Sequence, residues 1–204
     1  MTADGGIARL GVFGGAFDPP HIGHVALARA AVEQLALDQL RVFPTGQAWH
    51  KARELSSAQH RLAMAQLAFA QVPRARVDGR ELQRAGPTYT VDTLRELQRE
   101  FPGAELFLVI GADQAEALHS WRESAEIARI ATIAIAARAR PVEAAPVLDP
   151  SRLPAGRRAS LDMPPMPVSS TEIRRRAAAG EGYVQLVPAP VARYIDQHSV
   201  YRPT

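Results

Sequence analysis

The chain has 204 residues, 47% of them hydrophobic, and carries a formal net charge of +3 without any cysteine, which excludes disulfides and thiolate metal sites. No apolar run reaches the roughly 18 residues of a membrane span, the start lacks a secretory pattern and the basic residues are scattered, so we expect a cytoplasmic protein that binds neither membrane nor nucleic acid. The length predicts a single domain over residues 1–204, with a short flexible N-terminus at 1–7.

Strand-like apolar runs alternate with helical patterns along the chain. This predicts an α/β fold with a Rossmann-like, doubly wound and mostly parallel sheet that has helices on both faces. The first half is expected to hold strands at 8–13 and 41–43, helices at 22–37 and from Ser56 or Ser57 to about residue 71, and extended pieces at 76–78 and 81–82. The second half is expected to hold helices at 90–100, from Ser169 to Gly180 and at 190–197, strands at 106–111, 130–137 and 159–162, and an otherwise irregular, proline-rich segment at 138–168.

The most informative segment leads from a buried strand through a turn at Gly14 and Gly15 into a helix that begins with His21 and His24. Two glycines let the backbone approach a phosphate or ribose, because a side chain would fill the ligand's volume. The two histidines are three residues apart and share one face of the helix start, where backbone N–H groups attract anions. We interpret the segment as a site for a nucleotide triphosphate. The alternative is an ordinary helix start with two partly exposed histidines.

A second anion-binding pattern lies about 150 residues later in the chain. Ser169, Ser170 and Thr171 place three hydroxyls at a predicted helix start, and Arg174 follows one turn further on. The simpler interpretation is a capping box, in which Glu172 reaches back to the start of the helix. Both interpretations are compatible, because hydroxyls, backbone N–H groups and a guanidinium at a helix N-terminus also form a strong anion site.

Two further places carry candidate ligand-binding residues. Asp113 follows Gly111 at the end of the most apolar predicted strand, where open α/β sheets place their ligands, so its carboxylate is a candidate contact to a ribose. Tyr89 and Thr90 stand at a predicted helix start, and Trp121 offers an aromatic face to a planar ring. The alternatives are cap positions for Asp113 and Thr90 and a half-buried core position for Trp121.

Residues 14–24 resemble the Gly-Gly-Thr-Phe-Asp-Pro-x-His-x-Gly-His signature of bacterial nicotinate-nucleotide adenylyltransferases, within the nucleotidyltransferase superfamily. Residues 168–174 are similar to the family's Ile-Ser-Ser-Thr-x-Ile-Arg motif, residues 87–90 to its Pro-x-Tyr-Thr pattern, and residues 49–51 to its Pro-His-Lys loop, with Trp in place of Pro. The chain departs from the signature at Ala16, where the family has Thr or Ser. It therefore lacks the hydroxyl that helps hold the acceptor phosphate in the family.

The resemblance implies transfer of AMP from ATP to nicotinate mononucleotide, which gives deamido-NAD and pyrophosphate in NAD biosynthesis. It also implies Mg²⁺ carried by the ATP phosphates. His21, His24 and Arg174 would be catalytic by stabilising charge rather than by removing a proton. The residues that would bind ATP are Gly14, Gly15, Phe17, His21, His24, Gly111, Asp113, Ser169, Ser170, Thr171 and Arg174. Those that would bind nicotinate mononucleotide are Ala16, Lys51, Tyr89, Thr90 and Trp121.

Other functions stay open at this point. The nearest is the same chemistry on nicotinamide mononucleotide or phosphopantetheine, although Thr90 and Trp121 argue against the latter, which has no pyridine ring. Another is a catalytically inactive nucleotide-binding regulator. His-Ile-Gly-His also marks class I aminoacyl-tRNA synthetases, but the chain has neither a Lys-Met-Ser-Lys-Ser segment nor the length for a tRNA-binding domain. The sequence leaves open the oligomeric state and the roles of Trp49, Arg138 and Arg140.

Overall fold

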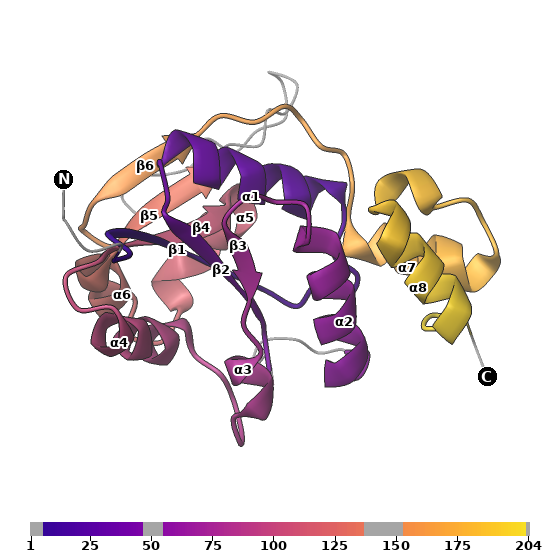
Figure 1. Cartoon of the computed structure of the whole chain (residues 1–204), viewed down its shortest axis with the longest axis horizontal. Coiled ribbons are helices and arrows are strands. Elements are labelled where there is room, and N and C mark those ends of the chain that lie inside the picture. Colours follow the sequence, from indigo (N-terminus) through magenta and orange to yellow (C-terminus); the bar gives the residue numbers. More distant parts are fainter. Residues whose placement is uncertain (1–5, 47–54, 137–152, 203–204) are drawn as a thin grey trace.

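The computed structural model describes residues 6–46, 55–136 and 153–202. Six strands form one sheet in the order β3-β2-β1-β4-β5-β6, and each neighbouring pair is parallel (Figure 1). The strands are β1 (Arg9–Gly15), β2 (Gln39–Pro44), β3 (Ala75–Val77), β4 (Glu105–Gly111), β5 (Ala131–Ala136) and β6 (Arg158–Leu161). This parallel sheet and its strand order confirm the predicted α/β, Rossmann-like class.

Helices cover both faces of the sheet. They are α1 (Ile22–Gln34), α2 (Ala58–Phe69), α3 (Arg80–Gln83), α4 (Thr90–Glu100), α5 (Ala112–Ala117), α6 (Ser124–Ile130), α7 (Ser170–Ala179) and α8 (Ala189–His198). Buried residues of α1, α2, α7 and α8 belong to one hydrophobic cluster, and those of α4, α5 and α6 to the other. In Figure 1, α7 and α8 lie together at the end of the molecule nearest α2.

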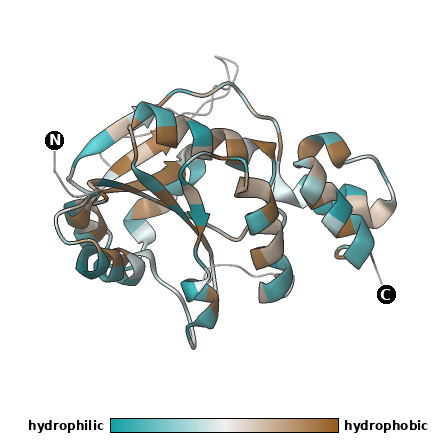
Figure 2. Ribbon diagram, viewed as in Figure 1, coloured by the Kyte–Doolittle hydropathy of each residue, from teal (hydrophilic) through white to brown (hydrophobic). Residues whose placement is uncertain are grey.

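The alternation of side chains along the central strands builds these two clusters. In β4, Leu106, Leu108 and Ile110 contribute to one cluster, whereas Phe107 and Val109 contribute to the other. Successive strand residues point to opposite faces, so a strand that is covered on both sides must be apolar throughout. Figure 2 shows this as hydrophobic colouring on the central strands, with hydrophilic residues on the outer surfaces of the helices.

The predicted turn at Gly14 and Gly15 is wrong, because both glycines belong to β1. They continue the ladder to β2, opposite Phe43 and Pro44, so the strand extends two residues further than expected. The chain leaves the sheet only at residues 16–20. There Phe17 takes a left-handed backbone conformation with φ 47°.

Other predicted boundaries also need correction. Helix α1 ends at Gln34 rather than residue 37, because Ala36 adopts a positive φ of 47° and turns the chain. Residues 81–82 lie in α3 and are not extended, and Ile130 ends α6 instead of beginning β5. The short helix α6 was not predicted, and a helix at the place of α5 was considered only in the alternative that made Asp113 its cap.

The predictions for residues 1–7 and 138–168 fall partly outside the described residues. Residues 1–5 of the expected flexible N-terminus lie outside the described residues, whereas Ile7 is half-buried against the core. The predicted irregular segment at 138–168 is described from residue 153 onward, and β6 is the regular element in that part. Among the described helices, none combines the length and the apolarity that crossing a membrane requires.

Candidate active site

The sheet topology marks one place for a ligand. The chain runs outward from β1 through β2 to β3, and then returns to the other side of β1 with β4. Open α/β sheets bind ligands at the carboxyl ends of the strands that flank such a reversal. Gly14 and Gly15 end β1, and Gly111 ends β4. A Cβ atom added at Gly14 or Gly111 would have no described protein atom within 4 Å, so both strand ends border open space.

The two histidines lie at the start of α1, close to the end of β1. His21 is the N-cap residue and His24 the third residue of the helix, and their rings stack with centroids 3.7 Å apart. The backbone N–H of His21 donates to Nδ1 of His24 at 3.1 Å. Because Nδ1 accepts, the proton of a neutral His24 imidazole lies on Nε2, which is then a hydrogen-bond donor.

The second anion-binding segment lies against the first. The Ser170 hydroxyl donates to the carbonyl of Pro19 at 2.8 Å, and the Arg174 guanidinium donates to the carbonyl of Asp18 at 2.6 Å. These contacts join residues 151 and 156 positions apart in sequence. The start of α7 and the loop before α1 therefore meet at one place in the molecule.

The start of α7 is capped by Ser169, as the sequence predicted. Its hydroxyl accepts from the backbone N–H of Glu172 at 3.2 Å. The expected reciprocal bond of a capping box is absent in this described helix, because the Glu172 carboxylate instead accepts from Arg175 and Arg176, which lower its pKa to about 2. Thr171 is exposed, and its hydroxyl accepts from Arg174 at 3.1 Å.

Phe17 and Ala16 lie between the two glycines and the first histidine. The Phe17 side chain is only 1% exposed and makes edge-to-face contacts with Phe13 and Phe69. It is a core residue, so any contact of Phe17 with a nucleotide has to use its backbone. The Ala16 carbonyl accepts from the guanidinium of Arg61 at 3.2 Å, which ties this loop to α2.

Asp113 lies in the first turn of α5, where it is exposed. The N-cap residue of α5 is Gly111, so Asp113 is not the cap itself. A carboxylate in a first helical turn is favourable because it faces the positive end of the helix. The same position, just beyond the carboxyl end of β4, is also where a ribose contact was predicted.

Three of the five predicted acceptor residues, Tyr89, Thr90 and Trp121, come from two neighbouring segments of the chain. Tyr89 is the N-cap residue of α4, so the cap position proposed for Thr90 is wrong; Thr90 is the first helical residue. Tyr89 and Trp121 are half-buried against the same hydrophobic cluster. The Arg122 guanidinium lies 4.5 Å from the centroid of the Tyr89 ring, which places the segment after α5 beside the start of α4.

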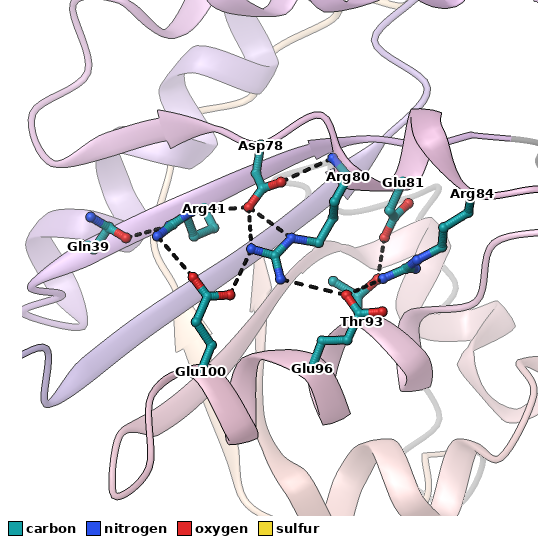
Figure 3. A network of polar contacts seen from close by, with 9 residues as sticks. All are labelled: Gln39, Arg41, Asp78, Arg80, Glu81, Arg84, Thr93, Glu96 and Glu100. Atoms are coloured by element: carbon teal, nitrogen blue, oxygen red, sulfur yellow. Dashed lines mark hydrogen bonds and ion pairs between the residues drawn. The ribbon is translucent and has the colours of Figure 1, made fainter.

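A polar network fixes α3 and the loop that leads to Tyr89 (Figure 3). The Thr93 hydroxyl donates to the buried carboxylate of Glu81 at 2.6 Å and accepts from Arg84 at 2.9 Å. Arg84 also donates to Glu96 at 2.6 Å. Burial raises the pKa of Glu81, although the Thr93 hydrogen bond and the charge of Arg84 oppose it. These bonds join α3 to the middle of α4 across residues 84–89.

The other half of the network holds the end of β3. Asp78 accepts from Arg80 at 2.7 Å and from Arg41 at 3.0 Å, and Arg80 also donates to Glu100 at 2.8 Å (Figure 3). Burial by itself would raise the pKa of Asp78, but the hydrogen bonds and charges of the two arginines outweigh it and hold the pKa below its usual value.

Sequence reasoning missed three residues that shape the loop before α1. Arg61 is 4% exposed and donates to the carbonyls of Ala16, Thr45 and Ser56. The side chains of Asp18 and Tyr201 are hydrogen-bonded to each other at 2.8 Å. Asp18 belongs to the quoted signature without a predicted role. Arg61 occupies an ordinary position in a helical pattern and Tyr201 lies in a turn after α8, so no sequence signal marked them.

Several predicted residues cannot be placed. Lys51 and Trp49 lie outside the described residues, as do Arg138 and Arg140. The predicted contact of Lys51 with the acceptor phosphate therefore stays a prediction.

Comparison with known proteins shows the family of the chain. The cytidylyltransferase-like family model matches residues 12–176. The chain is 54% identical to a probable nicotinate-nucleotide adenylyltransferase of Albidiferax ferrireducens, over 95% of this chain and 98% of that one. A second such protein, from Methylibium petroleiphilum, is 47% identical over 96% and 93% of the two chains.

Solved structures show the same fold. A Plasmodium falciparum nicotinic acid mononucleotide adenylyltransferase complexed with NaAD superimposes with a TM-score of 0.77 at 17% identity, covering 95% of this chain and 97% of the other. A putative nicotinate-nucleotide adenylyltransferase from Vibrio parahaemolyticus gives a TM-score of 0.70 at 17% identity, over 97% and 98% of the chains. The chain belongs to the cytidylyltransferase-like family and, within it, to the nicotinate-nucleotide adenylyltransferases.

Proposed function

We propose that this chain transfers AMP from ATP to nicotinate mononucleotide, giving deamido-NAD and pyrophosphate, a step of NAD biosynthesis. The observation that carries the proposal is the meeting of two anion-binding helix starts. The hydrogen bonds from Ser170 to Pro19 and from Arg174 to Asp18 hold the start of α7 against the loop before α1. Two such helix starts at the carboxyl edge of a parallel sheet suit a polyanionic nucleotide.

The reaction needs little covalent help from the protein. An oxygen of the acceptor's phosphate attacks the α-phosphorus of ATP, and the bond from that phosphorus to the oxygen bridging to the β-phosphorus breaks. Pyrophosphate leaves with the bridging oxygen. The attacking phosphate is already an anion, so no general base is required, and catalysis rests on positioning and on charge stabilisation.

The residues divide this work between them. His21 and His24 donate to the phosphate on which charge develops, and a neutral His24 ring carries its proton on Nε2 because Nδ1 accepts a hydrogen bond. Ser169, Thr171 and Arg174 hold the departing pyrophosphate. Mg²⁺ supplies charge neutralisation when ATP brings it, and the described residues include no cluster of three or more His, Asp or Glu that could hold a metal ion.

The remaining candidates hold the two nucleosides. Gly14 and Gly15 let the nucleotide approach the end of β1, and Asp113 contacts the adenosine ribose. Tyr89, Thr90 and Trp121 hold the pyridine carboxylate and ring of the acceptor, and Lys51 holds its phosphate. We further propose that residues 1–204 act as one domain in the cytoplasm.

Pyrophosphate release from ATP tests this proposal. The protein should release pyrophosphate with nicotinate mononucleotide, and kcat/KM should be higher for this acceptor than for nicotinamide mononucleotide. Turnover with phosphopantetheine alone would identify a different acceptor. ATP binding without turnover on any of the three acceptors would show a regulator and overturn the proposal.

A further inference from the structure

The carboxylate of Asp18 is buried beside the phosphate-binding loop. Its side chain is 1% exposed. Oδ1 accepts from the hydroxyl of Tyr201 at 2.8 Å, and Oδ2 accepts from the backbone N–H of Ser56 at 3.2 Å. Tyr201 follows α8 near the end of the chain, 183 residues from Asp18 in sequence. Tyr201 of the C-terminal segment and Ser56, two residues before α2, thus both hydrogen-bond to a side chain of the loop that leads to the catalytic histidines.

The main chain of the same loop is held by α7. The carbonyl of Asp18 accepts from Arg174, and the carbonyl of Pro19 accepts from Ser170. The loop also contains Phe17 with a φ of 47°, a conformation that costs free energy for a non-glycine residue and persists only where the surroundings enforce it. Hydrogen bonds from α7, from Ser56 and from Tyr201 hold the two residues that follow Phe17, Asp18 and Pro19.

The Tyr201 hydroxyl stays protonated in this position and can act as a hydrogen-bond donor. Burial raises its pKa, and the nearby charge of Asp18 and the hydrogen bond to it raise it further. The phenol therefore stays protonated throughout the physiological pH range and keeps its proton directed at Asp18. The hydroxyl also lies 3.8 Å from Sδ of Met64, a fully buried residue of α2, so the ring is fixed against the core.

We propose that Tyr201 is a positioning residue for adenylyl transfer, which acts through the Asp18 carboxylate to hold residues 16–20 in the shape that aims His21 and His24 at the reacting phosphate. The inference rests on the proposed function. His21 follows Pro20 directly, so a change in the loop moves the histidine cap itself. Displacement of a catalytic group by about 1 Å can cost roughly a hundredfold in rate, so a lost loop contact acts on kcat before it acts on binding.

Tyr201→Phe removes only the hydroxyl, and the chain offers a matched control. Tyr183 donates to Asp196 at 2.8 Å, a phenol-to-carboxylate hydrogen bond of the same length in the same C-terminal part of the chain. Tyr183→Phe removes that bond without touching residues 16–20. We expect Tyr201→Phe to lower kcat by about tenfold or more while the KM values for ATP and acceptor change less than about twofold, and Tyr183→Phe to leave all three nearly unchanged.

Thermal unfolding of both variants separates positioning from stability. Similar losses of Tm with a kcat effect confined to Tyr201→Phe support the proposal, whereas equal kcat effects in both variants, or none in Tyr201→Phe, overturn it. A double-mutant cycle with Asp18→Ala, which removes both oxygens that accept from Tyr201 and Ser56, tests the route: Tyr201→Phe should lower kcat little further in the Asp18→Ala background, because its partner is already gone. Additive losses would show that Tyr201 does not act through Asp18. A wild-type protein inactive on every acceptor would instead overturn the proposed function.

Discussion

The stacked histidines at the start of α1 are not equivalent. The backbone of His21 serves as a donor in the helix cap, whereas the His24 ring accepts at Nδ1, so that a neutral ring carries its proton on Nε2. Removal of a preorganised donor to a developing charge costs about 10²–10³ in kcat. We expect His24→Ala to lower kcat by at least about a hundredfold in a pyrophosphate-release assay. His198→Ala, at the exposed end of α8, is the control and should change kcat little. A loss below threefold would remove His24 from the catalytic residues.

Lys51 is the only lysine in a chain otherwise rich in arginine. In the proposed function Ala16 leaves the acceptor phosphate with one contact fewer, so the ammonium group of Lys51 would carry a larger share of its binding. A charged hydrogen bond of this kind contributes about 1.5–3 kcal/mol, so Lys51→Ala should raise the KM for nicotinate mononucleotide by roughly tenfold or more. The KM for ATP should stay nearly constant. Steady-state kinetics with each substrate varied in turn checks this, and equal increases in both KM values would refute the assignment.

Residues were predictable from sequence where their chemistry and spacing were unusual. Two glycines before a di-histidine helix start and a row of three hydroxyls point to anion binding by themselves. The contact of Asp18 with Tyr201 and the three carbonyls held by Arg61 were not predictable, because they join distant segments without any local pattern. Phe17 was assigned to ATP, but its ring fills the core, because the left-handed backbone at this position directs it inward.

Among the elements, α3 and α4 depend on a carboxylate that is unfavourably buried. The pKa of Glu81 is raised in the folded protein, so the folded state binds its proton more tightly than the unfolded state does. The contribution of Glu81 to the free energy of unfolding is therefore fully present below the ordinary glutamate pKa. It is lost as pH rises through the raised pKa of the folded protein. Glu81→Gln does not show this loss of stability, because a glutamine does not titrate. The free energy of unfolding of the variant relative to wild type should increase from about pH 4 to pH 7, as measured by urea denaturation.

Glu123 provides a control of opposite sign on the neighbouring helix. Its hydrogen bond from Arg95 lowers its pKa, so its contribution to stability is present above the ordinary pKa and is lost as pH falls. Glu123→Gln should therefore lose stability relative to wild type as pH rises over the same range. A flat difference for Glu81→Gln, or the same sign in both variants, would contradict the role assigned to the buried carboxylate.

The elements that sequence predicted well have strong local signals at their ends. Helix α7 has Ser169 as its cap and Gly180 in the left-handed conformation at its end, and α4 begins and ends where the pattern placed it. Helices α5 and α6 have only six and seven residues, too few to establish a periodic pattern. The N-cap residue of α6, Glu123, is left-handed, which is not a recognisable start signal.

For the whole molecule, the apolar strands predict a sheet covered on both faces, and the strand order of that sheet determines where the candidate site lies. Near-continuous apolar runs such as β4 require cover on both faces, and in this fold the helices between parallel strands supply it. The strand order then places the ends of β1 and β4 side by side, and this is where the glycines and the two anion-binding segments converge. The strand order itself could not be read from local sequence, because it depends on which strands pair.

The convergence at the reversal point can be tested by adding single methyl groups. Gly14, Gly111 and Gly182 each have open space where a Cβ would lie, and none has a positive φ, so alanine fits the described structure at all three. Away from special features, such surface changes alter stability by less than about 0.5 kcal/mol. At the ends of β1 and β4, however, the methyl group occupies the volume assigned to the nucleotide.

We expect Gly14→Ala and Gly111→Ala to raise the KM for ATP by roughly tenfold. Gly182→Ala, in the loop after α7, should leave it unchanged, and Tm should be similar in all three. If Gly14→Ala and Gly111→Ala bind ATP as well as Gly182→Ala does, the nucleotide does not lie at this edge of the sheet.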